Sequence, residues 1–226
     1  MNYSSLSVGI LLLPIFFVGS SRADTVTSDF MTIADGRVQS SGVLGQELFT
    51  SEEDVATRRS GNSNISDGLF EFDLSALPGD ANLVSAEIIF RTAAAITNTN
   101  SSAEVEFFGF TGNGSIELSD EGAAATLLAS VDFTTSVGND TTISAAFSNL
   151  TAIESVLSDG NSDDFFALRT ETVNFVTLSV DSLESSDVNA APATLRLTFE
   201  TESVPEPSSM AFFGLGVLGF VLRRRR

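Results

Sequence analysis

Hydrophobic and polar residues alternate in short runs through the middle of the chain. Phe70, Phe72 and Leu74 fall on one face of a predicted strand, and Glu71 and Asp73 fall on the other. A period of two residues is typical of a β-strand with one buried face, because successive side chains point to opposite sides of the sheet. The pattern therefore predicts that the apolar residues enter a core while the two acidic residues face solvent.

Similar runs predict further strands before and after this segment. Inward-facing rows are expected at Val84, Ala86, Ile88 and Phe90 and at Leu195, Leu197 and Phe199, and other strands at 105–108, 127–133, 165–168 and 175–180. Gly, Asn, Asp and Ser residues separate the runs and favour turns. Many short strands of this kind are typical of an all-β sandwich. We therefore expect residues 24–202 to form one antiparallel β-sandwich.

One segment departs from the strand period and predicts a short helix. Its apolar residues are spaced three and four positions apart, as on one face of a helix. Asn149 or Ser148 is suited to cap the start of this helix, and Gly160 is suited to end it. The apolar face consists of Leu150, Ile153, Val156 and Leu157.

The first residues carry the pattern of a secretory signal peptide. An apolar stretch runs from Val8 to Val18, and Ser21 and Ala23 place small residues at the two positions that a signal peptidase reads. No Lys or Arg precedes this stretch, so only the α-amino group supplies positive charge there. An uncleaved anchor is normally longer. We expect signal peptidase to remove residues 1–23.

The net charge of the chain restricts its possible partners. The chain has 30 acidic and 11 basic residues, and the segment 24–206 keeps all 30 acidic residues against six arginines, a net charge of −24. Such a surface repels phosphate backbones, which excludes nucleic acid as a partner. Arg58 and Arg59 form the one local basic spot and are expected to lie in a solvated turn.

The missing residue types restrict catalysis. The chain has no His, Cys, Trp or Lys, and its single tyrosine, Tyr3, lies in the predicted signal peptide. Ser-His-Asp and Cys-His chemistry is therefore excluded. A pair of carboxylates could still support a glycoside hydrolase or lyase. The pairs Glu104 with Glu106 and Glu71 with Asp73 are, however, what a solvated strand face also presents, so we expect no enzyme.

A polar segment after the predicted helix is a candidate calcium loop. Asp159, Asn161, Asp163 and Asp164 present oxygen ligands in close sequence, which is the chemistry that Ca²⁺ prefers. The segment lacks the glycine of an EF-hand at its sixth position, where Asp164 stands. The alternative is a polar turn held by a hydrogen bond from an Asp or Asn side chain. No cofactor is required by the sequence, and calcium is the one for which it offers ligands.

Phenylalanine is the only aromatic residue left to stack on a sugar ring. Trp and Tyr usually fill this role because they combine a flat face with a polar edge. Phe108 and Phe110 share one strand face, and Phe107 lies on the opposite face. Phe108 and Phe110 are therefore candidate glycan contacts, with core packing as the alternative.

The end of the chain combines three features in a fixed order. The residues Val204, Pro205, Glu206 and Pro207 precede an apolar stretch, 210–222, and Arg223, Arg224, Arg225 and Arg226 follow it. The prolines favour an extended, accessible segment, a span from Ser208 to Leu222 is near the short limit for crossing a bilayer, and the arginines favour the cytoplasmic side. A plain anchor that is never cut is the alternative to a processed signal.

Residues 203–226 resemble the PEP-CTERM sorting signal of exported bacterial proteins, which has these three parts in this order. The resemblance implies a Gram-negative host that makes an extracellular polysaccharide. It also implies passage through the inner membrane, transient membrane contact through the C-terminal helix, and cleavage near the Pro-Glu-Pro motif by an exosortase, a membrane-embedded cysteine protease. It leaves open whether the processed protein is released or tethered.

A second resemblance covers the central domain. Segments 69–79 and 84–90, together with 166–171 and 191–197, are similar to the central hairpin and closing elements of DNRLRE-type domains. That resemblance implies a jelly-roll-like β-sandwich of secreted bacterial proteins, some of which bind polysaccharides.

Together these features predict an exported, non-catalytic cell-surface or extracellular-matrix protein with a structural or adhesive role in the polysaccharide layer. The first alternative is a calcium-assisted carbohydrate-binding module. The second is a carboxylate-dependent glycoside hydrolase or lyase. An exposed phenylalanine beside a calcium loop would favour the first alternative, and a buried carboxylate pair in a cleft would favour the second.

Overall fold

The middle of the chain folds into strands that pack as two layers. A computed structural model describes residues 24–41, 45–60, 64–77, 82–98, 103–133, 137–158 and 164–201. The predicted signal peptide, residues 1–23, and the predicted sorting signal, residues 203–226, lie outside these ranges. Residues 25–201 form one compact unit.

The described residues form twelve strands, one 3₁₀ helix and one α-helix. The strands are β1 (Asp24–Ser41), β2 (Gly45–Phe49), β3 (Asp54–Arg59), β4 (Asn64–Asp73), β5 (Asn82–Arg91), β6 (Thr97–Asn98), β7 (Glu104–Thr111), β8 (Thr126–Asp132), β9 (Thr142–Ala146), β10 (Phe165–Thr172), β11 (Val176–Asp181) and β12 (Thr194–Thr201). The helices are η1 (Leu118–Gly122) and α1 (Thr151–Ser158).

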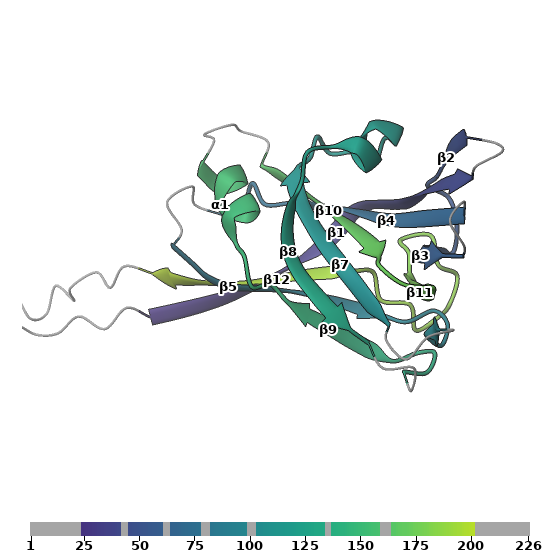
Figure 1. Ribbon diagram of the computed structural model, residues 1–226. Coiled ribbons are helices and arrows are strands. Elements are labelled where there is room, and N and C mark those ends of the chain that lie inside the picture. The colour runs from purple at the N-terminus through teal and green to yellow at the C-terminus, as the bar shows by residue number, and fades with distance from the viewer. Residues whose placement is uncertain are drawn as a thin grey trace, which may run out of the picture. The chain divides into compact units, whose positions relative to one another are not determined.

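Strand β1 is long enough to join both layers. Its second half pairs with β4, and the layer continues antiparallel through β10 and β7 to β8. Along its first half it neighbours β12, which is followed by β5 and β9. Figure 1 shows β5, β12 and β9 passing beneath β7, β8 and β10. The predicted all-β sandwich with one α-helix is confirmed.

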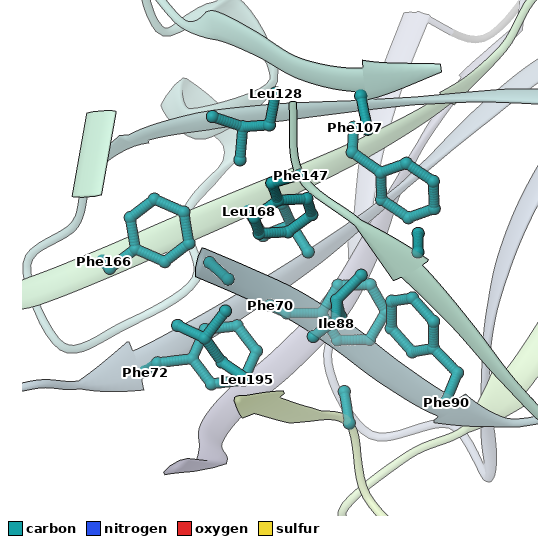
Figure 2. Packing of buried hydrophobic residues seen from close by; sticks show 14 of the residues in the cluster. Phe70, Phe72, Ile88, Phe90, Phe107, Leu128, Phe147, Phe166, Leu168 and Leu195 are labelled. Atoms are coloured by element: carbon teal, nitrogen blue, oxygen red, sulfur yellow. The ribbon is translucent and has the colours of Figure 1, made fainter. Parts of the chain in front are cut away.

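Aromatic side chains fill the space between the layers (Figure 2). Phe70 on β4 meets Phe90 on β5 with ring centroids 5.1 Å apart, and Phe107 on β7 lies 6.2 Å from Phe90. Tilted and offset rings at such distances add to the stabilisation from burial alone. The inward rows predicted at Phe70, Phe72 and Leu74 and at Leu195, Leu197 and Phe199 are buried in this core.

A β-bulge corrects one predicted row. Between β5 and β12 the register shifts, so that Ser85 pairs with Thr198 whereas Leu83 pairs with Phe199. The extra residue reverses the alternation at this end of β5. Leu83 is therefore buried and Val84 is 47% exposed, and the prediction that Val84 faces the core is wrong.

Helix α1 confirms the predicted helical segment. Asn149 caps its start, because its side-chain oxygen accepts hydrogen bonds from the Thr151 amide at 3.1 Å and the Thr151 hydroxyl at 2.9 Å. The helix packs its buried residues, which include Ile153 and Val156, against β7, β8 and β10. The predicted stop, Gly160, lies outside the described residues.

The outer face of the β4 layer was predicted to face solvent, but it is covered in the structure. The segment around η1 lies over a second cluster, formed by Val38, Leu69, Phe110 and Ala167, and Leu48 of the neighbouring strand β2 packs against the same cluster. Under this cover Glu71 is only 1% exposed, and its Oε1 accepts hydrogen bonds from the amides of Asn113 and Gly114 at 2.6 and 3.1 Å. The prediction that Glu71 is solvated is therefore wrong, whereas Asp73 is exposed as expected.

Candidate functional site

The predicted calcium loop is described only at its last residue. Asp159, Asn161 and Asp163 lie outside the described residues. The main-chain carbonyl of Asp164 accepts a hydrogen bond from the Leu74 amide at 2.8 Å, and its buried Oδ1 has no hydrogen-bond partner among the described residues. Within the described ranges, no group of three or more His, Cys, Asp or Glu side chains is placed to hold a metal ion. Calcium binding remains a prediction.

The two predicted glycan contacts lie in different surroundings. Phe110 belongs to the second cluster and is 7% exposed, so its ring is packed inside the protein. Phe108 is half-buried, and the guanidinium carbon of Arg169 lies 5.4 Å from its ring centroid. The arginine thus covers one face of this ring.

The predicted sorting residues cannot be placed in the fold. Val204, Pro205, Glu206 and Pro207, the helix expected from Ser208 to Leu222, and Arg223, Arg224, Arg225 and Arg226 all lie outside the described residues. None of the helices that the structure does describe combines the length and hydropathy needed to cross a membrane.

A polar pocket opens where β1, β4, β3 and β11 lie side by side. Its volume is about 330 Å³, which is within the range of small-molecule sites. The floor is made by the small buried residues Ala56, Ser66 and Ser179. Larger polar side chains surround this floor, so that the difference in side-chain size creates the hollow. The remaining lining residues are Arg37, Gln39, Asp54, Arg58, Asn64, Ile65 and Thr177.

The strand register aligns four of the lining residues in one row. Gln39 pairs with Ser66, Ser66 pairs with Arg58, and Arg58 pairs with Thr177. Directly paired residues point to the same face of a sheet. Because adjacent strands are about 4.8 Å apart, this row is about 14 Å long. The pocket therefore presents hydrogen-bonding groups along one line across four strands.

The floor of the pocket is internally bonded, whereas its rim is not. The Ser66 hydroxyl donates to the Ala56 carbonyl at 2.7 Å, and the Ser179 hydroxyl donates to the Asp54 carboxylate. Within the described part of the chain, the side chains of Gln39, Arg58, Asn64 and Thr177 form no hydrogen bond or ion pair. These rim groups are available to a ligand.

Arg58 is the open positive charge of this pocket. Arg37 is paired with Glu52 at 2.5 Å and stacks over Phe49. Arg59, the neighbour of Arg58, donates to the Val173 carbonyl at 3.4 Å and does not line the pocket. Arg58 is exposed. The expectation that Arg58 and Arg59 occupy a turn is wrong, because they are the last two residues of strand β3.

Sequence reasoning missed this pocket because its members come from four strands. The row exists only through the pairing of β1, β4, β3 and β11, which no local pattern reports. The one available signal was the rarity of basic residues, with six arginines against 30 acidic residues between 24 and 206.

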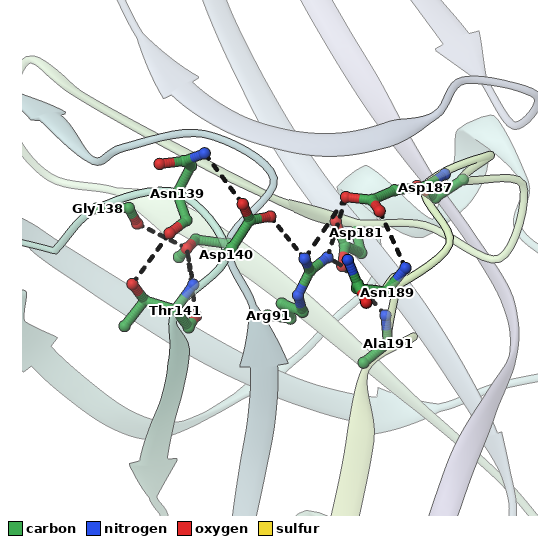
Figure 3. Close-up of polar contacts among 11 residues, drawn as sticks. Arg91, Gly138, Asn139, Asp140, Thr141, Asp181, Asp187, Asn189 and Ala191 are labelled. Carbon is green, nitrogen blue, oxygen red and sulfur yellow. Dashed lines mark hydrogen bonds and ion pairs between the residues drawn. The ribbon is translucent and has the colours of Figure 1, made fainter.

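A contrasting cluster surrounds Arg91 (Figure 3). The guanidinium pairs with Asp181 and with Asp140 at 2.6 Å each, and with Asp187 at 3.5 Å. Asp181 also accepts the Ala191 amide at 3.1 Å. These contacts raise the pKa of Arg91, with the hydrogen bond to Asp181 as the largest cause. The cluster joins the end of β5 to β11 and to two loops, and it leaves little of Arg91 for a ligand.

Two buried carboxylates lie outside both of these groups. Burial raises the pKa of Asp35 to about 7, although its Oδ2 accepts the Leu183 amide at 2.9 Å. Burial also raises the pKa of Asp67 to about 7, and the charges of Glu171 and Glu121 act in the same direction. Within the part of the chain that the structure describes, one buried oxygen of each carboxylate has no hydrogen-bond partner. Both carboxyl groups therefore keep a proton to a higher pH than an ordinary aspartate does.

Comparison with known proteins identifies one short region. The PEP-CTERM protein-sorting motif matches residues 203–226. No curated protein matches the chain. Among solved structures, the chain is similar to the CBM22-1-GH10 modules of Clostridium thermocellum endo-1,4-beta-D-xylanase 10B complexed with xylohexaose, at 13% identity and a TM-score of 0.30. The similarity covers 82% of this chain and 29% of that one.

Proposed function

We propose that the protein is an exported, non-catalytic component of the cell surface or extracellular matrix, with a structural or adhesive role in the polysaccharide layer. The observation that carries this proposal is the sorting motif at residues 203–226, which implies export and processing by an exosortase at the membrane. The predicted signal peptide, residues 1–23, fits the same route. Signal peptidase and exosortase are then the partners during export.

The surroundings of the acidic residues support a non-catalytic role. Glu71 is held by two main-chain amides under a covering loop, and Asp73 is exposed two residues away. Glu104 accepts the Ser130 hydroxyl at 2.6 Å on an open strand face. A glycosidase needs one protonated and one ionised carboxyl flanking a substrate. The resemblance to DNRLRE-type secreted domains, with their jelly-roll-like fold, belongs to the same proposal.

A carbohydrate-binding module is the second candidate. The observation that favours it is the polar pocket, whose rim offers amide, hydroxyl and guanidinium groups that have no partner among the described residues. Assistance by calcium at Asp159, Asn161, Asp163 and Asp164 stays part of this second candidate.

The sorting role can be tested in a host that has an exosortase. When the full sequence is expressed, we expect the protein to lose its C-terminal arginines and reach the surface. Mass spectrometry of the surface fraction would detect this. Replacing Pro205, Glu206 and Pro207 by alanine should leave the tail uncut and the protein in the inner membrane. A host lacking the exosortase should give the same result with the unchanged chain. Normal processing of the alanine variant would contradict the proposal.

A further inference from the structure

We propose that the pocket between β1, β4, β3 and β11 binds a single carboxylated sugar unit within an otherwise neutral glycan, and that Arg58 holds the carboxylate. This inference rests on the proposed role in the polysaccharide layer and names the chemistry that would be recognised there.

The shape of the pocket suits a sugar unit within a chain. Its small floor residues leave about 330 Å³ of space, and the row from Gln39 to Thr177 extends about 14 Å across the strands. A shallow site of this length can accept a glycan lying across the strands. The bonded floor fixes its shape before a ligand arrives, which reduces the cost of binding.

The chemistry of the rim distinguishes an acidic sugar from a neutral one. A guanidinium can donate two parallel hydrogen bonds to a carboxylate, and Arg58 forms no ion pair in the described part of the chain. The amides of Gln39 and Asn64 and the hydroxyl of Thr177 can both donate and accept, as sugar hydroxyls do. Arg58 is thus a cation without an ion-pair partner among the described residues, next to neutral amide and hydroxyl groups, and this arrangement matches one carboxylate among hydroxyls.

The charges around the pocket limit the ligand to one acidic unit. Asp54 also lines the pocket, four residues before Arg58 on β3 and therefore about 13 Å away. Glu52 already occupies Arg37 at the wall. With a net charge of −24 over residues 24–206, the surface repels a polymer that carries an acid on every unit. Screening over about 8 Å at physiological salt leaves the local attraction of Arg58 intact.

The test is calorimetric titration of the full chain in detergent with two matched disaccharides. Cellobiouronic acid and cellobiose differ by one carboxylate. We expect cellobiouronic acid to bind about tenfold more tightly, because a charge-assisted pair is gained. Arg58→Ala should remove that preference, whereas Arg59→Ala, with the same loss of charge outside the pocket, should keep it. Trigalacturonic acid should bind more weakly than cellobiouronic acid.

Three results would overturn the inference: no binding of either disaccharide, equal binding of both, or an equal loss of affinity in the Arg58→Ala and Arg59→Ala variants. Tighter binding of trigalacturonic acid would overturn its restriction to one acidic unit. The outcome is separable from the sorting role. The variant with alanine at Pro205, Glu206 and Pro207 should bind cellobiouronic acid normally, and Arg58→Ala should be exported and processed normally.

Discussion

Arg91 and Arg58 carry the same charge on neighbouring parts of the fold, yet their surroundings are opposite. Arg91 is 9% exposed and binds three carboxylates from two loops and β11. Arg58 is exposed at the end of β3 and has no carboxylate partner within the described residues. The chain is rich in acidic residues, so a shortage of carboxylates does not explain why Arg58 lacks such a partner. The strand register explains it, because it places no carboxylate beside Arg58.

The register along β11 explains the difference. Asp181 pairs with Asp54 at one end of the β3–β11 ladder, and Thr177 pairs with Arg58 at the other. Arg91, arriving from β5, reaches the acidic end of this ladder. Arg58 faces a threonine on one side and Ser66 on the other. The acidic end becomes a clamp within the fold, and the neutral end remains open.

The largest expected effect is the loss of the clamp. Arg91→Ala should lower the free energy of unfolding by about 3–5 kcal/mol, because it leaves Asp181 buried without its counter-charge. Urea unfolding followed by circular dichroism measures this change. Arg196→Ala is the matched control, since Arg196 pairs with Asp29 and Glu87 while 40% exposed and should cost at most about 1 kcal/mol. Equal losses in the two variants would remove the distinction between clamp and surface pair.

Asp67 is a buried carboxylate that forms no ion pair with an arginine among the described residues. Replacing it should therefore raise the stability of the fold, whereas replacing Arg91 should lower it. Asp67 is 7% exposed, and its pKa is raised to about 7 from an unfolded value of about 4. Between these values the folded protein binds a proton that the unfolded chain releases, so stability falls as pH rises from 4 to 7. Above pH 7 the full cost of burying the charge is present.

Asp67→Asn should therefore raise the free energy of unfolding by about 1–2 kcal/mol at pH 8 and leave it nearly unchanged at pH 4. Urea titrations at both pH values measure the difference. Asp73→Asn is the control, because hydrogen bonds from Ser75 lower the pKa of Asp73 and its replacement should reduce stability at pH 8. A gain for Asp67→Asn that is equal at both pH values would show that charge burial is not its cause.

The outer side of the Arg91 cluster should contribute much less than its inner side. The side chain of Asp140 is 52% exposed, whereas that of Asp181 is 3% exposed. Asp140→Asn should cost about 0.2–1 kcal/mol and become neutral at high salt. Asparagine tolerates the positive φ of 55° at this position, so the backbone is not strained by the change. Asp181→Asn makes the same chemical change at the buried end and should cost several times more in the same unfolding assay.

The features that sequence predicted are those that depend on neighbours along the chain. The alternation at Phe70 and Phe72 and the helical spacing around Ile153 each report which face is buried, because burial follows the local period. The prediction of Asn149 or Ser148 as the helix cap has the same local basis, and in the structure it is Asn149 that accepts the Thr151 amide. These elements could be predicted without knowing how the strands pair.

The features that sequence missed depend on distant segments. Glu71 is buried because the segment around Asn113 folds over it, and Val84 turns outward because of a bulge opposite β12. The pocket around Arg58 needs the register of four strands. An alternating pattern reports two faces of a strand but cannot report that a loop covers the second face.

The smallest expected effect, that of replacing Arg58, is the most direct test of the contrast between Arg58 and Arg91. Arg58→Ala should change the free energy of unfolding by less than about 0.5 kcal/mol, because it removes no hydrogen bond or ion pair to any residue that the structure describes. Arg59→Ala makes the same change of net charge next to it and serves as the control in urea unfolding. If Arg58→Ala destabilised the fold as Arg91→Ala does, Arg58 would be a second clamp. If it leaves stability unchanged, Arg58 has no stabilising role at the rim, which is the outcome that the proposed role in ligand binding requires.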